Sequence, residues 1–175
     1  MKNAWCLFLL VMTTPAAAQM RGFVELDTRL SVVRDQFATF TGVRAAVMPN
    51  PSLYVGLVGT GLATSNATVA APAGASTLRM GYGGLLIGTA PPTPGTTRIF
   101  ADVLVGAGGL SAEGLGRDAI FVLEPALGAD LKLAGAVRFA IGASYRFVSG
   151  VDLPSLAASD LRGVSATIAL RLGWY

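Results

Sequence analysis

The 175-residue sequence contains no histidine and only one cysteine. Without histidine, the chain has no Ser–His or Cys–His pair for nucleophilic catalysis and no imidazole ligand for a metal ion. The single thiol, Cys6, has no second cysteine with which to form a disulfide. Charged residues are also few, 13% of the chain, and they are spread along it, so the basic patch typical of nucleic-acid binding is missing. These absences favour a protein that is not an enzyme, has no cofactor and binds no nucleic acid.

The sequence also lacks a hydrophobic run long enough to cross a bilayer as a helix, which takes about 20 residues. The uncharged stretch Ala45–Leu78 is interrupted by prolines and glycines. The shorter apolar run Ala4–Met12 follows a lysine and precedes the small residues Ala16–Ala18, which is the order found in a secretory signal peptide. We therefore expect a signal peptide at residues 1–18 and a mature domain at residues 19–175.

Glycine and apolar side chains are abundant, with 22 glycines, 53% hydrophobic residues and a mean hydropathy of +0.59. Their arrangement is periodic: in Phe121–Leu131 every odd position is apolar, and Val137–Phe147 repeats the pattern after a short turn. Successive side chains of a strand point to opposite faces, so each run has one apolar face and one face dominated by small and charged residues. An apolar outside around a cramped, charged inside is typical of a membrane β-barrel.

The same alternation predicts an all-β fold, an eight-stranded antiparallel up-and-down transmembrane β-barrel. Eight strands make the smallest common closed barrel, and closure gives every backbone N–H and C=O group a partner inside hydrocarbon. The predicted strands are Phe23–Val33, Phe37–Val47, Ser52–Leu62, Leu78–Gly88, Arg98–Gly108, Phe121–Leu131, Val137–Phe147 and Arg162–Trp174.

Connections of two kinds join the predicted strands. Ala63–Thr77, Gly109–Asp118 and Ser149–Asp160 have no periodicity and predict loops at one end of the barrel, where we expect any extracellular ligand to bind. The other end has short turns, as in outer-membrane barrels. Pro125 falls inside a strand, where it removes a ladder hydrogen bond, and it predicts a bulge or a local irregularity.

The pattern leaves the facing of the second predicted strand open. In the second strand, Arg44 alone marks the inward parity, and in the fourth we expect Leu78, Met80 and Tyr82 to face outward. Aromatic residues with outward parity favour an interfacial girdle over platforms for stacking a ligand. The expected girdle consists of Tyr82, Tyr145, Phe147 and Trp174.

Most charged residues of the predicted strands stand at positions that face the lumen. In an eight-stranded barrel the lumen is just wide enough for side chains to fill. Unpaired charges there would be poorly solvated, so we expect a paired network that plugs the barrel. Acid/base catalysis by Glu25 with Asp27, or by Glu124 with Asp130, is a weaker interpretation than structural pairing with arginine. The expected network consists of Glu25, Asp27, Arg29, Arg44, Arg79, Asp102, Glu124, Asp130, Lys132, Arg138, Arg146 and Arg171.

Three short segments carry a resemblance to a known family: Tyr82-Gly83-Gly84, Glu124-Pro125 and Ser144-Tyr145-Arg146-Phe147. With these segments the mature chain resembles the small outer-membrane β-barrel proteins of Gram-negative bacteria. The resemblance implies a barrel in the cell outer membrane, surrounded by outer-membrane lipid and inserted by the barrel-assembly machinery. It supplies no catalytic residues.

Three functions stay open at this point. The first is a monomeric, non-enzymatic outer-membrane barrel with a plugged, charge-paired lumen and a structural or surface-recognition role. The second is a lipid-modifying outer-membrane enzyme that uses serine, tyrosine or carboxylate groups. The third is a periplasmic barrel that binds an apolar ligand, which requires the apolar face to point inward.

Overall fold

The described part of the chain is almost entirely β-sheet. The structure, a computed structural model, describes residues 21–33, 36–64, 68–71, 74–112, 116–152 and 156–174. The signal peptide expected at residues 1–18 lies outside these residues. Within the described ranges, no helix is both long enough and apolar enough to cross a membrane.

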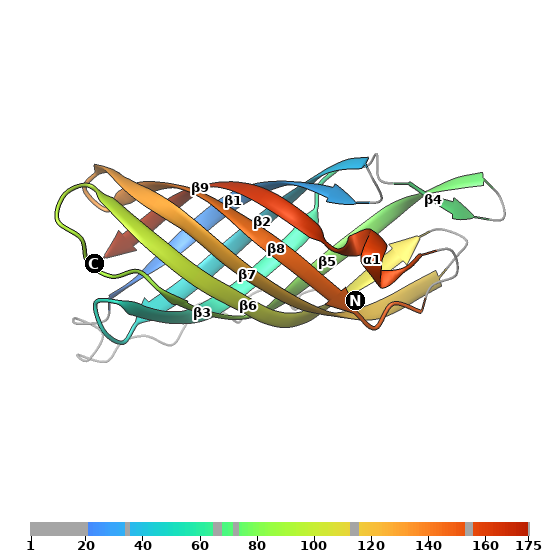
Figure 1. The fold of residues 1–175 in the computed structure, drawn as a ribbon, viewed down its shortest axis with the longest axis horizontal. Helices are drawn as coiled ribbons and strands as arrows, with labels where there is room; N and C mark the ends of the chain where they lie inside the picture. Colours follow the sequence, from blue (N-terminus) through green and yellow to red (C-terminus); the bar gives the residue numbers. More distant parts are fainter. Residues whose placement is uncertain are drawn as a thin grey trace, which may run out of the picture.

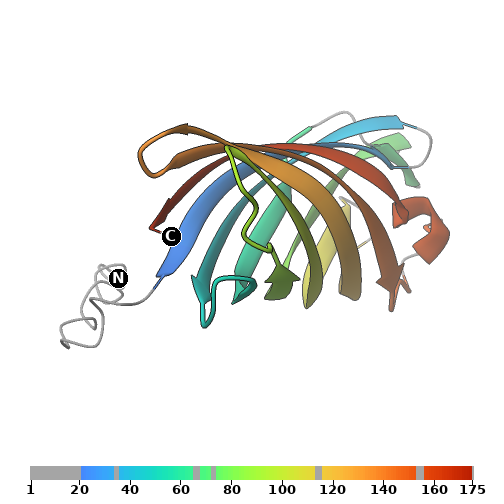
Figure 2. The same cartoon turned by 60° about the vertical axis from the view of Figure 1, so that its left-hand side comes forward.

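Long strands follow one another along the chain with a common tilt (Figures 1 and 2). The alternation of apolar and small residues forms them, because it lets each strand turn one face to a lipid surface and the other to a narrow interior. The elements are β1 (Arg21–Val33), β2 (Gln36–Met48), β3 (Leu53–Leu62), β4 (Thr68–Ala71), β5 (Gly74–Thr89), β6 (Thr97–Ala112), β7 (Gly116–Ala134), β8 (Val137–Ser149), α1 (Ala158–Leu161) and β9 (Gly163–Trp174).

Eight of these strands form a closed antiparallel barrel. Their order is β3-β2-β1-β9-β8-β7-β6-β5, and pairing of β3 with β5, from Leu53 opposite Thr89 to Gly61 opposite Gly81, closes the ring. The remaining strand, β4, pairs with the start of β5 and lies outside the ring. The predicted eight-stranded up-and-down topology is confirmed.

The two ends of the barrel differ (Figure 1). At one end, the turn end, short connections join β2 to β3, β5 to β6 and β7 to β8, and β9 finishes beside the start of β1. Gly135 takes a φ of +53° in the β7–β8 turn, a conformation that glycine adopts at little cost. The opposite end, the loop end, carries β4 and α1.

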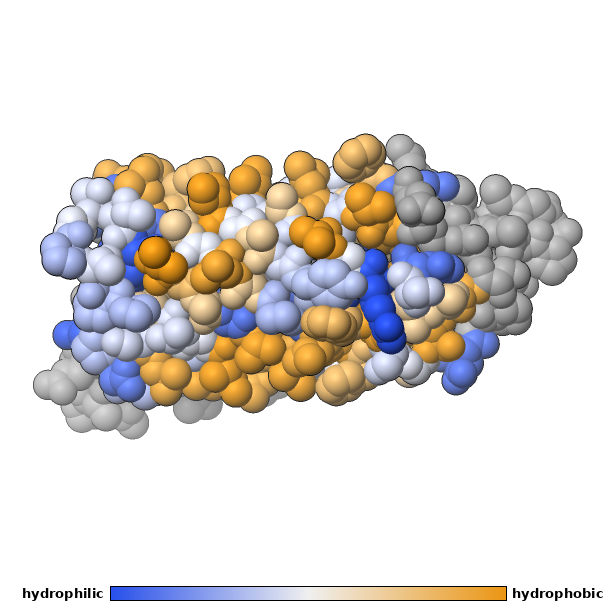
Figure 3. Space-filling model, in the orientation of Figure 1, coloured by the Kyte–Doolittle hydropathy of each residue, from blue (hydrophilic) through white to orange (hydrophobic). Residues whose placement is uncertain are grey.

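The outer wall is apolar between the two ends. Leu57, Leu127 and Ile168 leave 68%, 61% and 54% of their surface exposed, and hydrophobic residues lie along the wall in Figure 3, with paler residues between them. Charged residues of β7 and β9 are buried in the interior, among them Glu124 and Arg171. The facings predicted for six of the eight strands are confirmed, and the second strand, whose facing the sequence left open, turns Arg44 inward.

Interior glycines make room for the large side chains of neighbouring strands. Gly88 lies opposite Tyr54, and a Cβ atom at Gly88 would overlap the Tyr54 ring. At Gly42, a Cβ atom would lie 2.9 Å from a carboxylate oxygen of Asp27. The glycines of the inward face therefore allow a tyrosine and a carboxylate to reach into the lumen.

The facing predicted for the fourth strand is wrong. Antiparallel partners share a face, and Tyr82 of β5 lies opposite Thr60, which is buried inside the barrel. Leu78, Met80 and Tyr82 are consequently buried, and Arg79 is exposed on the outer wall. Both faces of β5 carry apolar residues, so alternation alone does not orient this strand, and Tyr82 does not belong to an outer girdle.

Two of the predicted loops are partly strand. In Ala63–Thr77 the structure has β4 and the beginning of β5, and in Gly109–Asp118 it has the end of β6 and the beginning of β7. Strands that extend beyond the apolar wall pair through their backbones and need no apolar alternation, so the sequence pattern does not reveal them. The third predicted loop, Ser149–Asp160, contains the start of α1.

Pro125 interrupts one of the two ladders of β7. The ladder with β8 runs to Leu123, skips Glu124 and Pro125, and resumes at Ala126 in the same register. Proline has no N–H group to donate, so the gap is the expected local irregularity. The register shift of β7 falls instead at Lys132, next to the turn end.

Candidate functional site in the charged lumen

The lumen contains a continuous set of ion pairs, which begins toward the loop end with Glu124 of β7. The carboxylate of Glu124 accepts hydrogen bonds from Arg29 at 2.9 Å, from the Tyr82 hydroxyl at 2.7 Å and from the Ser144 hydroxyl at 2.6 Å. These donors come from β1, β5 and β8. One side chain of β7 thus joins three other strands across the interior.

Arg29 and Arg44 continue the network from Glu124 along the lumen. Arg29 donates from Nε to Asp27 at 2.7 Å. Arg44 lies among three carboxylates, with its Nε 3.3 Å from Glu25 and 3.4 Å from Asp27 and its Nη1 3.4 Å from Asp102. The guanidinium group suits this position because its planar fork can contact several carboxylates at once.

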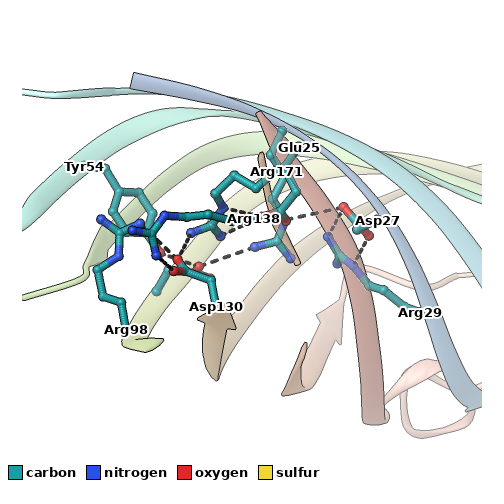
Figure 4. A network of polar contacts seen from close by, with 10 residues as sticks. Glu25, Asp27, Arg29, Tyr54, Arg98, Asp130, Arg138 and Arg171 are labelled. Atoms are coloured by element: carbon teal, nitrogen blue, oxygen red, sulfur yellow. Dashed lines mark hydrogen bonds and ion pairs between the residues drawn. The ribbon is translucent and has the colours of Figure 1, made fainter. Parts of the chain in front are cut away.

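Asp130 of β7 is the meeting point of the network at the turn end (Figure 4). Its carboxylate contacts Arg171 at 2.9 Å, Arg98 at 2.9 Å and Arg138 at 2.5 Å. Arg171 also contacts Glu25 at 2.6 Å, which connects this group to the carboxylates around Arg44. The network therefore extends from Glu124 to Asp130 without a break.

The Tyr54 ring and two phenylalanines fill the space around these charges. Tyr54 donates its hydroxyl hydrogen bond to Asp102 at 2.7 Å, and its ring packs edge-on against Phe23, with 5.3 Å between the ring centroids. The Arg171 guanidinium carbon lies 4.2 Å from the Phe23 ring centroid and 5.0 Å from that of Phe100, distances at which the aromatic face attracts a cation.

Arg146 differs from the other interior arginines because the described residues include no carboxylate within ion-pair distance of it. It is fully buried, and it donates from Nε to the Leu161 carbonyl at 2.9 Å and from Nη2 to the Ser31 hydroxyl at 3.4 Å. Its guanidinium carbon lies 4.5 Å from the Phe40 ring centroid. Backbone, hydroxyl and aromatic groups thus hold this cation.

Toward the loop end, the interior changes from charged to apolar. Leu161 of α1 is completely buried and Leu156 nearly so. Asp160 accepts a hydrogen bond from the backbone N–H of Ala157 at 3.1 Å, which stabilises this one-turn helix. The buried apolar residues of this end are Val33, Leu78, Leu110, Ala112, Ile120, Val148, Leu156 and Leu161.

Ten of the twelve residues predicted for the network lie in the interior, although Arg138 is only partly buried. The ten are Glu25, Asp27, Arg29, Arg44, Asp102, Glu124, Asp130, Arg138, Arg146 and Arg171. Arg79 is not among them because β5 has the opposite facing. Lys132 is also exposed, because it lies at the bulge beside the turn end, where water solvates its charge.

Sequence reasoning missed Arg98, Tyr54, Tyr82 and Ser144 as members of the network. Arg98 shares the inward parity of Asp102 on the same strand, so parity alone identifies it. The hydroxyl donors carry no charge, and only the register of the strands reveals that they meet carboxylates. Among the described residues, no group of histidine, cysteine, aspartate or glutamate side chains is arranged to hold a metal ion.

The overall architecture resembles that of solved outer-membrane barrels. Neisserial surface protein A matches with a TM-score of 0.67 and 11% identity, over 89% of this chain and 97% of that one. The N-terminal β-barrel domain of Pseudomonas aeruginosa OprF matches with a TM-score of 0.62 and 10% identity, over 89% of this chain and all of that one. The chain has the fold of the eight-stranded outer-membrane β-barrels. No protein-family model and no curated protein sequence matches it.

Proposed function

We propose that this chain is a non-enzymatic barrel of the Gram-negative outer membrane that acts as a closed anchor and presents its loop end for structural or surface-recognition tasks. In this proposal residues 1–18 are removed on export, the barrel-assembly machinery inserts the remainder, and the barrel works as a monomer. The observation that carries the proposal is the unbroken ion-pair network from Glu124 to Asp130 inside an apolar wall.

The network supports a closed lumen. In an eight-stranded barrel the interior is just wide enough for side chains, and here arginines and carboxylates of neighbouring and of more distant strands meet at hydrogen-bonding distance inside it. The apolar residues around Leu161 fill the lumen at the loop end. Water and ions then have no continuous polar path along the barrel.

Two further observations bear on the alternatives. A periplasmic barrel for an apolar ligand requires an apolar interior, whereas the leucines and isoleucines of β1, β7 and β9 are exposed on the outside and arginines are buried inside. A lipid-modifying enzyme would need a carboxylate available for proton transfer. Glu25, Asp27, Glu124 and Asp130 are each held within 3.4 Å of at least one arginine.

We expect the purified barrel to show no steady, large conductance in planar-bilayer recordings. The ion pairs must separate before an ion can pass, and separating buried partners costs about 3–5 kcal/mol for each pair. The preparation should first be shown to be folded, by a band that shifts on a gel only after heating. Steady conductance from such a preparation would show that the lumen is open.

We expect the β4 hairpin to be dispensable for folding. The four residues of β4 pair only with the start of β5, beyond the closed ring, so replacing residues 65–76 by Asn-Gly should leave the heat-dependent gel shift unchanged. The matched comparison shortens the β8–β9 connection and deletes Leu156, which is buried at the loop end. This second variant should unfold at a lower temperature than wild type. Loss of assembly in the first variant would instead show that the β4 hairpin is part of the core.

A further inference from the structure

The outer wall carries a patch of bare backbone near the loop end. Gly59 and Gly61 of β3, Gly81 and Gly83 of β5 and Gly109 of β6 all have outward parity. They lie opposite one another across the strands, as Gly59 with Gly83, Gly61 with Gly81, and Gly81 with Gly109. We call these five residues the glycine patch. Elsewhere the wall at these strands presents large apolar side chains such as Leu57 and Leu85.

Two arginines border the glycine patch on the side of the loop end. Arg79 of β5 lies opposite Ser111 of β6, which lies opposite Arg117 of β7. Both arginines are exposed and have outward parity, and two strand spacings separate their backbones by about 10 Å. Neither guanidinium has an ion-pair partner among the described residues. A hollow of about 720 Å³ is lined by both arginines, Ser111, Gly81 and Gly109. Asp118 also lines it, and its carboxylate accepts hydrogen bonds from the backbone N–H groups of Ala119 and Asp152.

The order of residues along β5 places this hollow at the edge of the apolar wall. From the loop end toward the turn end, the outward positions of β5 are Arg79, Gly81, Gly83, Leu85 and Ile87. Leu85 and Ile87 belong to the exposed apolar surface. The arginines therefore lie where the hydrocarbon ends and lipid headgroups begin, a level at which anionic groups neutralise a guanidinium.

We infer that this hollow binds a phosphate-bearing lipid of the leaflet at the loop end. Arg79 and Arg117 contact the phosphate above Ser111, because guanidinium forks match phosphate oxygens in charge and geometry. The acyl chains lie over the glycine patch, where the absence of side chains lets them approach the backbone. This site rests on the membrane placement proposed above.

The test measures lipid retention by native mass spectrometry of the folded barrel in detergent micelles. The probes are phosphatidic acid, its phosphate-free counterpart diacylglycerol, and inorganic phosphate as a competitor. Wild type should retain phosphatidic acid at least tenfold more tightly than the Arg79→Gln/Arg117→Gln double variant and should not retain diacylglycerol. Arg21→Gln, an exposed arginine at the turn end, is the matched control for lost charge and should bind as wild type does.

A second variant separates a built site from general attraction between arginine and an anionic surface. Cβ atoms at Gly81 and Gly109 would have no contact closer than 3.6 Å, so Gly81→Leu/Gly109→Leu should fold while filling the hollow. It should weaken phosphatidic acid retention severalfold with both arginines present. Unchanged retention of phosphatidic acid in this variant or in the arginine variant would contradict the proposed site. Full displacement of phosphatidic acid by inorganic phosphate would contradict it as well. The heat-dependent gel shift of each variant shows separately whether the barrel has formed.

Discussion

Replacing Asp130 by alanine should lower the free energy of unfolding by about 3–5 kcal/mol, the cost of removing one partner of a buried ion pair. The effect should be large because Asp130 is completely buried and contacts three arginines, Arg98, Arg138 and Arg171. Of these, Arg171 retains its contact with Glu25. Denaturant titration of the barrel in lipid vesicles, followed by the gel shift or by tryptophan fluorescence, measures the change.

The matched control for Asp130→Ala is Asp152→Ala, which removes an exposed carboxylate at the loop end. Exposed charges contribute little to stability, so this variant should unfold within about 0.5 kcal/mol of wild type. An Asp130→Ala barrel that is as stable as wild type would mean that water solvates the lumen charges one by one. The plugged-lumen proposal would then have to be abandoned.

Replacing Leu127 by arginine should destabilise the barrel by about 2–4 kcal/mol, the measured range for arginine on the lipid face of a barrel near the bilayer midplane. Leu127 lies in the middle part of β7 with 61% of its surface exposed. For a soluble barrel the same exposed position would accept arginine at almost no cost. Unfolding titrations in vesicles and in detergent measure the change.

Leu133→Arg is the matched comparison for Leu127→Arg, because Leu133 is also an exposed leucine of β7 but lies next to the turn end. The cost of arginine falls to about 0–1 kcal/mol near the membrane interface. Gly128 is unsuitable for this comparison, since a Cβ atom there would contact Phe100 and the Ile141 carbonyl. Equal costs at Leu127 and Leu133 would contradict a transmembrane position of the wall.

The sequence predicts the barrel well wherever one face of a strand is apolar and the other is small or charged. In β1, Leu26 and Leu30 alternate with Glu25, Asp27 and Arg29, and this contrast alone orients the strand. The surroundings decide which residue types stand at such positions, because hydrocarbon and a narrow lumen require different residues. The facing of a strand therefore follows from side-chain chemistry without knowledge of its neighbours.

The sequence fails where that contrast disappears. In β5, Leu85 and Leu86 point to opposite faces, so parity is fixed only by pairing with β3 and β6. Beyond the apolar wall a strand needs no alternation of apolar residues, so nothing in the composition marks β4 as a strand. The sequence also does not show which side chains pair within the lumen. The contact between the Tyr82 hydroxyl and Glu124 follows only from the register of the closed ring.

The ion pairs of the lumen also bear on how the barrel assembles. Arg171 and Glu25 are 146 residues apart in the chain, and Arg29 and Glu124 are 95 apart. Such partners meet only when the last strand has joined the first, so a partly inserted sheet would expose unpaired arginines and carboxylates to hydrocarbon. The same charges that fill the finished barrel thus penalise every open intermediate and should make insertion and closure a single cooperative event.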